Sequence, residues 1–525
     1  MKSRNQIVHR GRIGVPVVAA GLVLAAVAGC DAAYEEDGAG QQPSSAAAAA
    51  RPDLAWGECP PAAEGAPRDE RLTCATVAVP LDHDDPDGKK IEVAVSKLPT
   101  AKSGKRKGVL VLNPGGPALQ GLDTPGAMAP TLPASVLDNY DLIGFDPRGV
   151  GHSTPQTCGL ENPSPLGLFP YPAADGSITA NVALAKDYAQ RCGSNAELKY
   201  FTTANTARDL DLVRAALGEE KISYWGQSYG TYLGTVYASM YPERTERVIL
   251  EGNVDPTKVW ADSAASWGKG MADRFPDAAA VAAGQNAALG LGATVEEVTG
   301  NYLALADRLD RTPAPVPGTD QAVSGALLRH VTYGLLLHND DLPVLVGFWK
   351  AVANLADGTP TEDDGKVLQQ VFAPGPVTPG VPPDNQVAMF LALTCGDAES
   401  SHDIDSYAAR VAADREKWPL TAGMPMGVRA CAFWPKPIEQ PVTVTDDGPR
   451  NTLILQNRRD HATPWEEGVG LRDVLGDRAV LVGVDNGGHY VYNEGSACVD
   501  DATVKFLSTG ELPAEDLECT DVEPK

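Results

Sequence analysis

The sequence predicts an α/β fold with a mostly parallel central sheet, interrupted by a largely helical insertion. Short apolar runs alternate with segments of helical periodicity, which is typical of a sheet buried on both faces. The runs are residues 108–113, 140–145, 221–225, 247–250, 452–456 and 479–484. Between the fourth and fifth runs, residues 256–390 are rich in Ala and Leu and break this rhythm. The composition, 43% hydrophobic and 21% charged, is that of a folded globular chain.

The N-terminal residues have the pattern of an export signal. Four cationic residues come first: Lys2, Arg4, Arg10 and Arg12. They precede an apolar stretch, residues 13–29, that ends in Val27-Ala28-Gly29-Cys30 and resembles the bacterial lipobox, where the cysteine is lipidated. An ordinary secretory signal and a short transmembrane helix are the alternatives. We expect a lipoprotein signal peptide at 1–29, a flexible tether at 30–52 and lipid attachment at Cys30, which makes this an extracellular lipoprotein of the cell surface or a secreted protein.

The net charge excludes one class of partner. It is −26 at pH 7, and loss of the cationic signal residues makes it −30. A surface this acidic repels phosphate backbones, so we expect no nucleic-acid partner and contact with a membrane only through a lipid anchor.

The cysteines indicate an oxidising compartment. There are nine, and eight remain if Cys30 carries lipid, an even number that points to disulfides in an exported chain. Pairing of sequence neighbours predicts the bonds Cys59–Cys74, Cys158–Cys192, Cys395–Cys431 and Cys498–Cys519; other pairings stay open. A zinc site is the competing interpretation, but the chain has no C-x-x-C spacing. We expect no metal and no organic cofactor.

The remaining chain divides into a core and its insertion. Helical periodicity marks residues 206–217 and 231–241 within the first part of the core, and residues 278–291 and 295–309 within the insertion. We expect core residues 53–255, a mostly helical lid at 256–390 and a C-terminal return to the core at 391–525. A separate helical domain with no catalytic role is the alternative for the insertion.

The motif Gly226-Gln227-Ser228-Tyr229-Gly230 carries the first chemical prediction. It lies between an apolar run and a helical stretch, so it resembles the nucleophile elbow of the α/β-hydrolase fold, with Ser228 as nucleophile. An acyl-transfer serine needs two donors for the oxyanion. We expect one from the backbone N–H of Tyr229 and the other from the loop after residues 108–113, where Gly115 and Gly116 allow close approach of the backbone.

The base and acid are expected later in the chain, because this fold presents Ser, acid and His in that order. His489 follows the run 479–484, and Asp460 follows the run 452–456, so we predict them as base and acid. His461 is the rival base and Asp485 the alternative acid.

Taken together, these motifs resemble the exported tripeptidyl aminopeptidase branch of the α/β-hydrolase peptidases, the prolyl aminopeptidase family. The matching segments are NPGGP (113–117), GFDPRGVGHSTP (144–155), the elbow region (200–256) and, in the TAP-like C-terminal part, NTLILQNRRDHATPWEEG (451–468) and NGGHYVY (486–492). Gln227 departs from the family, which usually has a small or aliphatic residue there. The resemblance implies an α/β-hydrolase fold and release of short peptides, often tripeptides, from a free N-terminus.

An aminopeptidase must recognise a protonated amine, which favours a carboxylate near the pocket. Glu251 and Asp255 follow the run after the elbow helix, so we consider both for this role, with capped loop carboxylates as the alternative. Carboxylates of the lid are equally suitable for binding the amine. Two other functions stay open. The same triad also suits an esterase, lactonase or amidase, and a binding lipoprotein that keeps the fold without catalysis is the third possibility.

Overall fold

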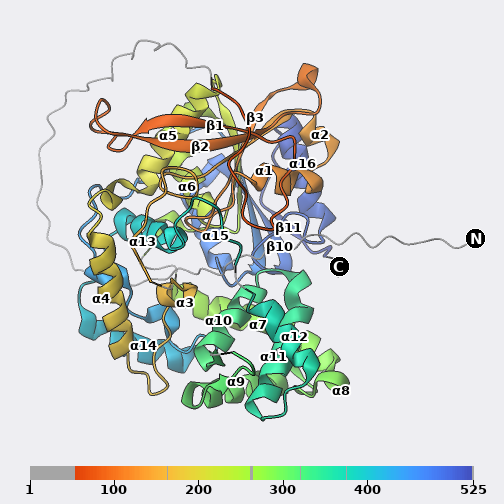
Figure 1. Ribbon diagram of the computed structural model, residues 1–525. Coiled ribbons are helices and arrows are strands. Elements are labelled where there is room, and N and C mark those ends of the chain that lie inside the picture. Colours follow the sequence, from red (N-terminus) through yellow and green to blue (C-terminus); the bar gives the residue numbers. More distant parts are fainter. Residues whose placement is uncertain (1–53, 162, 261–263, 320, 374, 523–525) are drawn as a thin grey trace, which may run out of the picture.

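The computed structural model describes residues 54–522 apart from residues 162, 261–263, 320 and 374. The expected signal peptide, tether and Cys30 lie outside these residues. No helix in the described part is both long and apolar enough to cross a bilayer. Figure 1 shows two bodies, a core built on a sheet and a helical cap beside one end of that sheet.

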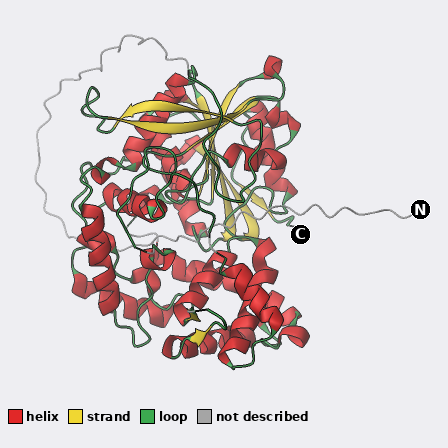
Figure 2. Cartoon of the chain, viewed as in Figure 1, coloured by secondary structure: helices red, strands yellow, loops and turns green. Residues whose placement is uncertain are grey.

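One sheet organises the core (Figure 2), and the described residues give it nine strands. Their order is β1-β2-β4-β3-β5-β6-β9-β10-β11. β2 runs antiparallel to β1 and β4, and all remaining neighbours are parallel. The strands are β1 (Thr73–Pro80), β2 (Lys90–Leu98), β3 (Gly108–Asn113), β4 (Tyr140–Phe145), β5 (Ile222–Gln227), β6 (Thr245–Glu251), β9 (Thr452–Arg459), β10 (Ala479–Gly487) and β11 (Leu517–Cys519).

All six expected strands are present, and the predicted α/β fold with a mostly parallel sheet is confirmed. β3 and β4 are buried at every residue, as strands covered on both faces should be. The sequence analysis did not predict β1, β2 and β11. β1 alternates buried and exposed residues along much of its length, and β11 has only three residues, so neither forms a continuous apolar run.

Helices cover both faces of the sheet. Along β3, Val111 packs in the cluster that contains Val213, Val236 and Leu471, whereas Leu110 packs in a second cluster on the opposite face. The first face is covered by α5 (Thr203–Ala216), α6 (Tyr229–Met240) and α15 (Trp465–Leu475), and the second by α1 (Thr124–Met128), α2 (Ala134–Leu137) and α16 (Ala497–Thr509).

The cap is made from two insertions, one after β4 and a longer one between β6 and β9. The first supplies α3 (Pro165–Leu168) and α4 (Thr179–Gly193). The second supplies α7 (Ala264–Gly284), α8 (Asn286–Leu289), α9 (Val295–Arg311), β7 (Ala314–Pro315), β8 (Ala322–Val323), α10 (Gly325–Leu335), α11 (Leu342–Ala356), α12 (Glu362–Val371), α13 (Asn385–Asp397) and α14 (Ile404–Lys417). The two insertions meet where Ala185 of α4 packs with Val411 of α14.

The helical region of the structure ends later in the chain than the expected lid, 256–390. The helical region continues beyond residue 390, which lies inside α13, and the sheet resumes only at Thr452. α13 is buried along nearly its whole length, so it lacks the polar face whose spacing reveals a helix in a sequence. The insertion that contains α4 was not predicted at all.

Four disulfides lie within the described part of the chain, and they are the bonds that neighbour pairing predicts. They join Cys59 to Cys74, Cys158 to Cys192, Cys395 to Cys431 and Cys498 to Cys519. Cys158–Cys192 and Cys395–Cys431 close loops of 34 and 36 residues that contain cap helices.

Candidate active site

Ser228 lies in the turn between β5 and α6, at the carboxyl end of the central strands. Its backbone has φ 56° and ψ −126°, a conformation that residues with a side chain rarely adopt. The flanking glycines allow this turn because a Cβ on Gly226 would lie 2.2 Å from the carbonyl oxygen of Gly230, and one on Gly230 would lie 2.7 Å from Asn113 Oδ1. The tight turn separates the Ser228 side chain from the sheet and from α6.

The glycine loop after β3 lies directly against this turn. A Cβ on Gly115 would lie 2.3 Å from the carbonyl oxygen of Gln227 and 2.9 Å from Ser228 Cβ. The Gly115 N–H donates to Asn113 Oδ1 at 3.0 Å, so Gly115 provides close approach and not an oxyanion donor. Gly116 and Tyr229 donate their backbone N–H groups to no described residue. For Tyr229 this is expected, since it is the first residue of α6.

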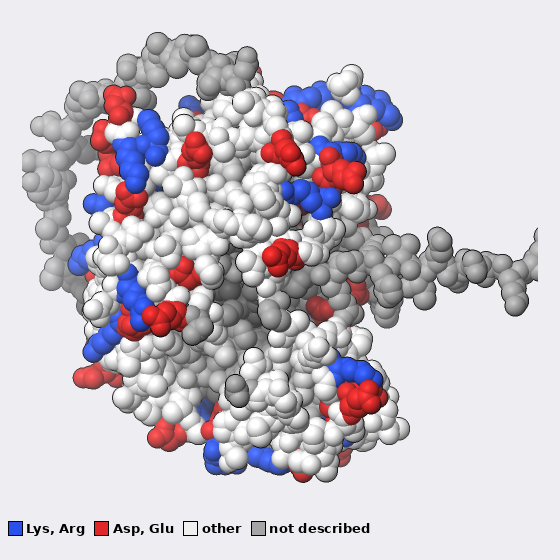
Figure 3. Space-filling model, in the orientation of Figure 1, with Lys and Arg blue, Asp and Glu red and all other residues white. Residues whose placement is uncertain are grey.

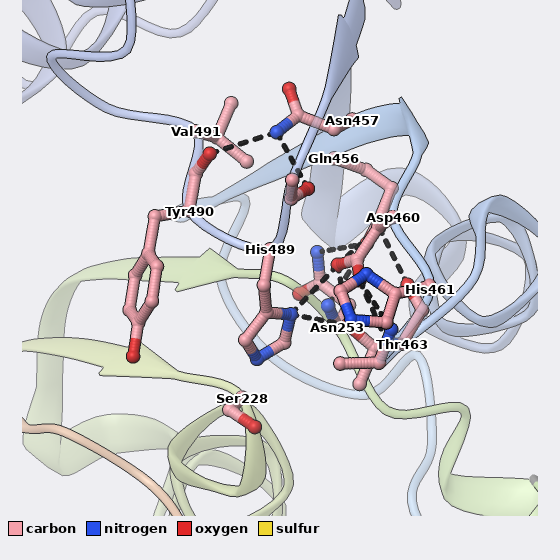
Figure 4. A network of polar contacts seen from close by, with 12 residues as sticks. Ser228, Asn253, Gln456, Asn457, Asp460, His461, Thr463, His489, Tyr490 and Val491 are labelled. Carbon is pink, nitrogen blue, oxygen red and sulfur yellow. Dashed lines mark hydrogen bonds and ion pairs between the residues drawn. The ribbon is translucent and has the colours of Figure 1, made fainter. Parts of the chain in front are cut away.

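Asp460 and His489 come together from the ends of β9 and β10 (Figure 4). His489 Nδ1 lies 2.8 Å from Asp460 Oδ2, and both side chains are buried. The other ring nitrogen, Nε2, points toward Ser228. Asp460 Oδ1 accepts the backbone N–H groups of Ala462 and Thr463, and Oδ2 also accepts the Thr463 hydroxyl at 2.8 Å. These bonds fix the orientation of the carboxylate.

The surroundings of His489 favour its protonated form. Burial by itself lowers the pKa of the imidazole, but the charge and hydrogen bond of Asp460 together with the charge of Glu251 outweigh burial and raise it. A general base with a raised pKa accepts a proton from a serine more readily.

The rival base His461 and the alternative acid Asp485 both bond to residues outside the proposed triad. His461 donates Nε2 to the carbonyl oxygen of Tyr333 at 2.8 Å in the cap, and burial lowers its pKa to about 3. Asp485 is largely exposed and pairs with Arg459 at 2.7 Å. Neither side chain reaches the Ser228–His489 pair.

The loop that carries His489 is held from three sides. Asn457 Nδ2 donates to the carbonyl oxygens of Gly488 and Tyr490 at 2.9 and 2.8 Å. The Glu251 carboxylate accepts the next two backbone N–H groups, those of Val491 and Tyr492, at 2.7 and 2.9 Å. The cap supplies the third contact, in which His489 donates its backbone N–H to the carbonyl oxygen of Leu337 at 2.8 Å.

The structure does not support the expected amine-binding role of Glu251 and Asp255. Glu251 is 1% exposed and its two oxygens accept four hydrogen bonds from the protein itself. Asp255 is also buried, accepts the N–H and hydroxyl of Thr257, and pairs with Lys258 at 2.9 Å. Sequence position placed both residues correctly near the elbow, but it could not reveal the donors that surround them.

The cap meets the triad region at the C-terminal end of α10. Near this end the carbonyl oxygen of Tyr333, in α10, accepts the His461 imidazole. Just after the helix, those of Leu336 and Leu337 accept Arg274 Nε at 3.0 Å and the His489 backbone N–H. Helix α7 packs closely on the same region: a Cβ added to its Gly270 would lie only 2.9 Å from His461 Cα. The face shown in Figure 3 is hollowed where cap and core meet, with small mixed clusters of acidic and basic side chains around it.

Three residues of this network were not identified from the sequence: Thr463, Asn457 and Gln456, whose Nε2 donates to Asp460 Oδ2 at 3.3 Å. Glu251 was identified, but for a different role. Only Thr463 had a local signal, because Asp followed by Thr three residues later is typical of a turn closed by side-chain hydrogen bonds. As for a metal, one cluster of three potential ligands occurs in the described residues: Cys498, Cys519 and Asp521. Its two cysteines form a disulfide and cannot bind a metal as thiolates.

Comparison with known families finds two matches along the chain. The family described as alpha/beta hydrolase fold matches residues 108–333, and the family described as TAP-like protein matches residues 420–519. The first match contains Ser228 and the second contains Asp460 and His489.

Curated relatives resemble nearly the whole chain. A tripeptidyl aminopeptidase of Streptomyces lividans is 32% identical over 90% of this chain and 88% of its own length. Serine protease Hip1 of Mycobacterium tuberculosis is 32% identical over 85% of this chain and 87% of its own length. Carboxylesterase B of the same species is 32% identical over 95% of both chains. A solved proline iminopeptidase of Mycobacterium smegmatis, at 14% identity over 82% of this chain and 97% of that one with a TM-score of 0.34, is too distant to add to the assignment.

Proposed function

The chain belongs to the tripeptidyl aminopeptidase family of α/β-hydrolase serine peptidases, and on that premise we propose that it releases short peptides, tripeptides above all, from the free N-terminus of peptide substrates. Ser228, His489 and Asp460 form the proposed triad. One observation carries the serine-hydrolase part of the proposal: the buried Asp460 carboxylate holds His489 Nδ1 at 2.8 Å while Nε2 points toward the serine of the elbow. The similarity to a tripeptidyl aminopeptidase supports the peptide substrate.

The proposed mechanism assigns each group one role. Ser228 Oγ attacks the carbonyl carbon of the scissile bond as His489 Nε2 takes its proton, and Asp460 stabilises the resulting imidazolium. The N–H groups of Tyr229 and Gly116 donate to the oxyanion. His489 then returns the proton to the leaving amine, which leaves an acyl-enzyme on Ser228. Water, activated by the same histidine, hydrolyses that ester and frees the peptide.

Two measurements test the proposal. Ser228→Ala should abolish turnover and fluorophosphonate labelling with an unchanged melting temperature, whereas Ser135→Ala, an exposed serine of α2, should behave like the wild type. Peptides with free and with acetylated N-termini should be compared as substrates, because only the free amine suits an aminopeptidase. Retained activity in Ser228→Ala would refute the triad, and equal cleavage of acetylated peptides would refute the exopeptidase assignment.

An ester substrate is the second candidate, and it has a specific observation in its favour. The relative named Carboxylesterase B is as similar to this chain as the peptidases are. The same triad hydrolyses esters and amides through an acyl-enzyme. Comparison of kcat/KM for ester and tripeptidyl substrates separates the two functions, because efficient ester turnover without aminopeptidase activity assigns the chain to this second function.

We also propose that the enzyme is exported and anchored through a lipid on Cys30. The disulfides support export, because such bonds persist in oxidising compartments. Cys30→Ala should move the protein from the membrane fraction to the culture medium. Equal retention of this variant in the membrane fraction would contradict the anchor.

A further inference from the structure

Glu251 lies at the end of β6, between the turn that carries the nucleophile and the loop that carries the base. Its side chain is buried, with 1% exposed. The parallel neighbours of β6 are β5, which leads into Ser228, and β9, which leads toward Asp460. Glu251 therefore occupies the position in the sheet from which both parts of the triad can be reached.

Each carboxylate oxygen of Glu251 bonds to a different part of the site. Oε2 accepts Trp225 Nε1 and Gln227 Nε2, both at 2.9 Å, from the strand and turn before the nucleophile. Oε1 accepts the backbone N–H groups of Val491 and Tyr492, which follow the base. In addition, the main-chain oxygen of Glu251 accepts the backbone N–H of Ser228 itself at 2.9 Å. One residue thus links the nucleophile turn to the His489 loop.

The chemistry of these contacts requires a carboxylate. All four partners of the side chain are N–H donors, and a carboxylate accepts at both oxygens without donating. A glutamine in its place would turn its NH₂ group toward two of these four donors, and two donors cannot form a hydrogen bond with each other. The side chain of Gln227, the second residue of the elbow motif, supplies one of the four donors through its amide.

The negative charge of Glu251 also acts on the base. Charged and titratable groups that interact with His489 are Asp460, Glu251 and the neutral His461, and the Tyr490 ring lies edge-on at 5.4 Å. Asp460 and Glu251 both raise the pKa of His489 against the effect of burial. Loss of the Glu251 charge should therefore lower that pKa.

We propose that Glu251 is a positioning residue of the catalytic site, which fixes the Ser228 turn relative to the His489 loop. The inference rests on the proposed triad but not on the peptide substrate. Its test therefore uses the second-order rate constant of inactivation by a fluorophosphonate, measured from pH 5 to 9 on the folded full-length protein. This rate depends on activation of Ser228 by His489 whatever the natural substrate is.

Glu251→Gln keeps the size of the side chain and removes the charge. We expect the inactivation rate at pH 8 to fall about 10- to 100-fold, because small displacements of reacting groups have effects of that size. We also expect the pH midpoint to move to lower pH. Gln227→Met, which removes one donor but keeps the carboxylate, should slow inactivation less and leave the midpoint in place. Glu246→Gln, an exposed glutamate of the same strand, should match the wild type.

The possible outcomes distinguish failure of the positioning role of Glu251 from failure of the proposed triad. A Glu251→Gln protein with the rate and midpoint of the wild type overturns the inference, as does a slower protein whose midpoint has not moved. If Glu251→Gln does not fold, Glu251→Asp decides: the shorter carboxylate should lower the rate while the midpoint stays in place, and a wild-type rate overturns the inference. Failure of the wild type to label at Ser228 would instead refute the proposed triad.

Discussion

Replacement of Asp460 by asparagine tests the triad most directly. The two backbone N–H groups that bond to Oδ1 require an oxygen at that position, so the amide oxygen of the introduced asparagine should stay there. The amide NH₂ then takes the place of Oδ2 and faces His489 Nδ1, which lies 2.8 Å away in the wild type. Two donors cannot share that contact, so His489 must accept at Nδ1 and carry its proton on Nε2, the nitrogen that should take the proton from Ser228.

The expected effect follows from this reversal of the tautomer. In serine proteases with this arrangement, the same change lowers kcat by about 10⁴-fold, which corresponds to about 5.5 kcal/mol at the transition state. We expect a loss of about 10³- to 10⁴-fold here, because the carboxylate is buried and surrounded by donors in the same way. KM should change little, since Asp460 is buried and contacts His489 at Nδ1, the nitrogen that points away from Ser228.

The assay is steady-state hydrolysis of a tripeptidyl chromogenic substrate, with thermal melting to verify folding. Asp485→Asn is the matched control, because Asp485 was the alternative acid and its exposed side chain pairs with Arg459. It should keep kcat within about twofold, as surface ion pairs contribute little. If Asp460→Asn kept more than a tenth of the wild-type kcat, or if Asp485→Asn lost as much, the assignment of the acid would be wrong.

Three further predictions follow from the same site. The acid limb of the pH profile of kcat/KM should have its midpoint above about 6.5, the ordinary value for histidine, because the pKa of His489 is raised and only its neutral form accepts a proton; a lower midpoint would contradict the pairing with Asp460. Gly115→Ala should reduce kcat by at least about tenfold, because its Cβ would lie 2.3 Å from the carbonyl oxygen before Ser228 at a φ of 89°, and an unchanged kcat would show that the glycine loop does not shape the site. Replacement of both Cys395 and Cys431 by serine should lower the free energy of unfolding by about 3–4 kcal/mol, as expected for a closed loop of this length; a denaturant midpoint equal to that of the wild type would refute a structural role.

The parts of the fold that the sequence predicted are those whose signal is local. The buried parallel strands are continuous apolar runs, and the elbow is recognisable because only glycine fits at Gly226 and Gly230. The acid and base could be placed because each follows such a strand. β1 and α13 escaped detection for opposite reasons: β1 alternates buried and exposed residues, with Thr76 and Ala78 exposed, and α13 is too apolar to show a helical period.

The contacts that argue against amine binding by Glu251 come from distant segments. Glu251 is separated from its partners in the base loop by more than 200 residues of sequence, whereas the carboxylate of Asp255 bonds to Thr257 and Lys258, which lie close to it in the chain. Nothing near Glu251 in the chain indicates that Val491 and Tyr492 will direct their N–H groups at it. Carboxylates of this kind are recognised as structural only when the donors around them are known.

The cap bonds directly to the loop that carries the proposed base. At the end of α10 and in the two residues after it, the carbonyl oxygens of Tyr333, Leu336 and Leu337 accept three donors from other segments: His461, Arg274 and the backbone of His489. The negative end of the helix dipole thus lies beside the base loop, where it favours the imidazolium that forms during catalysis. A lid whose only role was to cover the substrate would not need to bond to the base. The chain at 333–337 therefore belongs to the framework that holds the loop of His489, the proposed base.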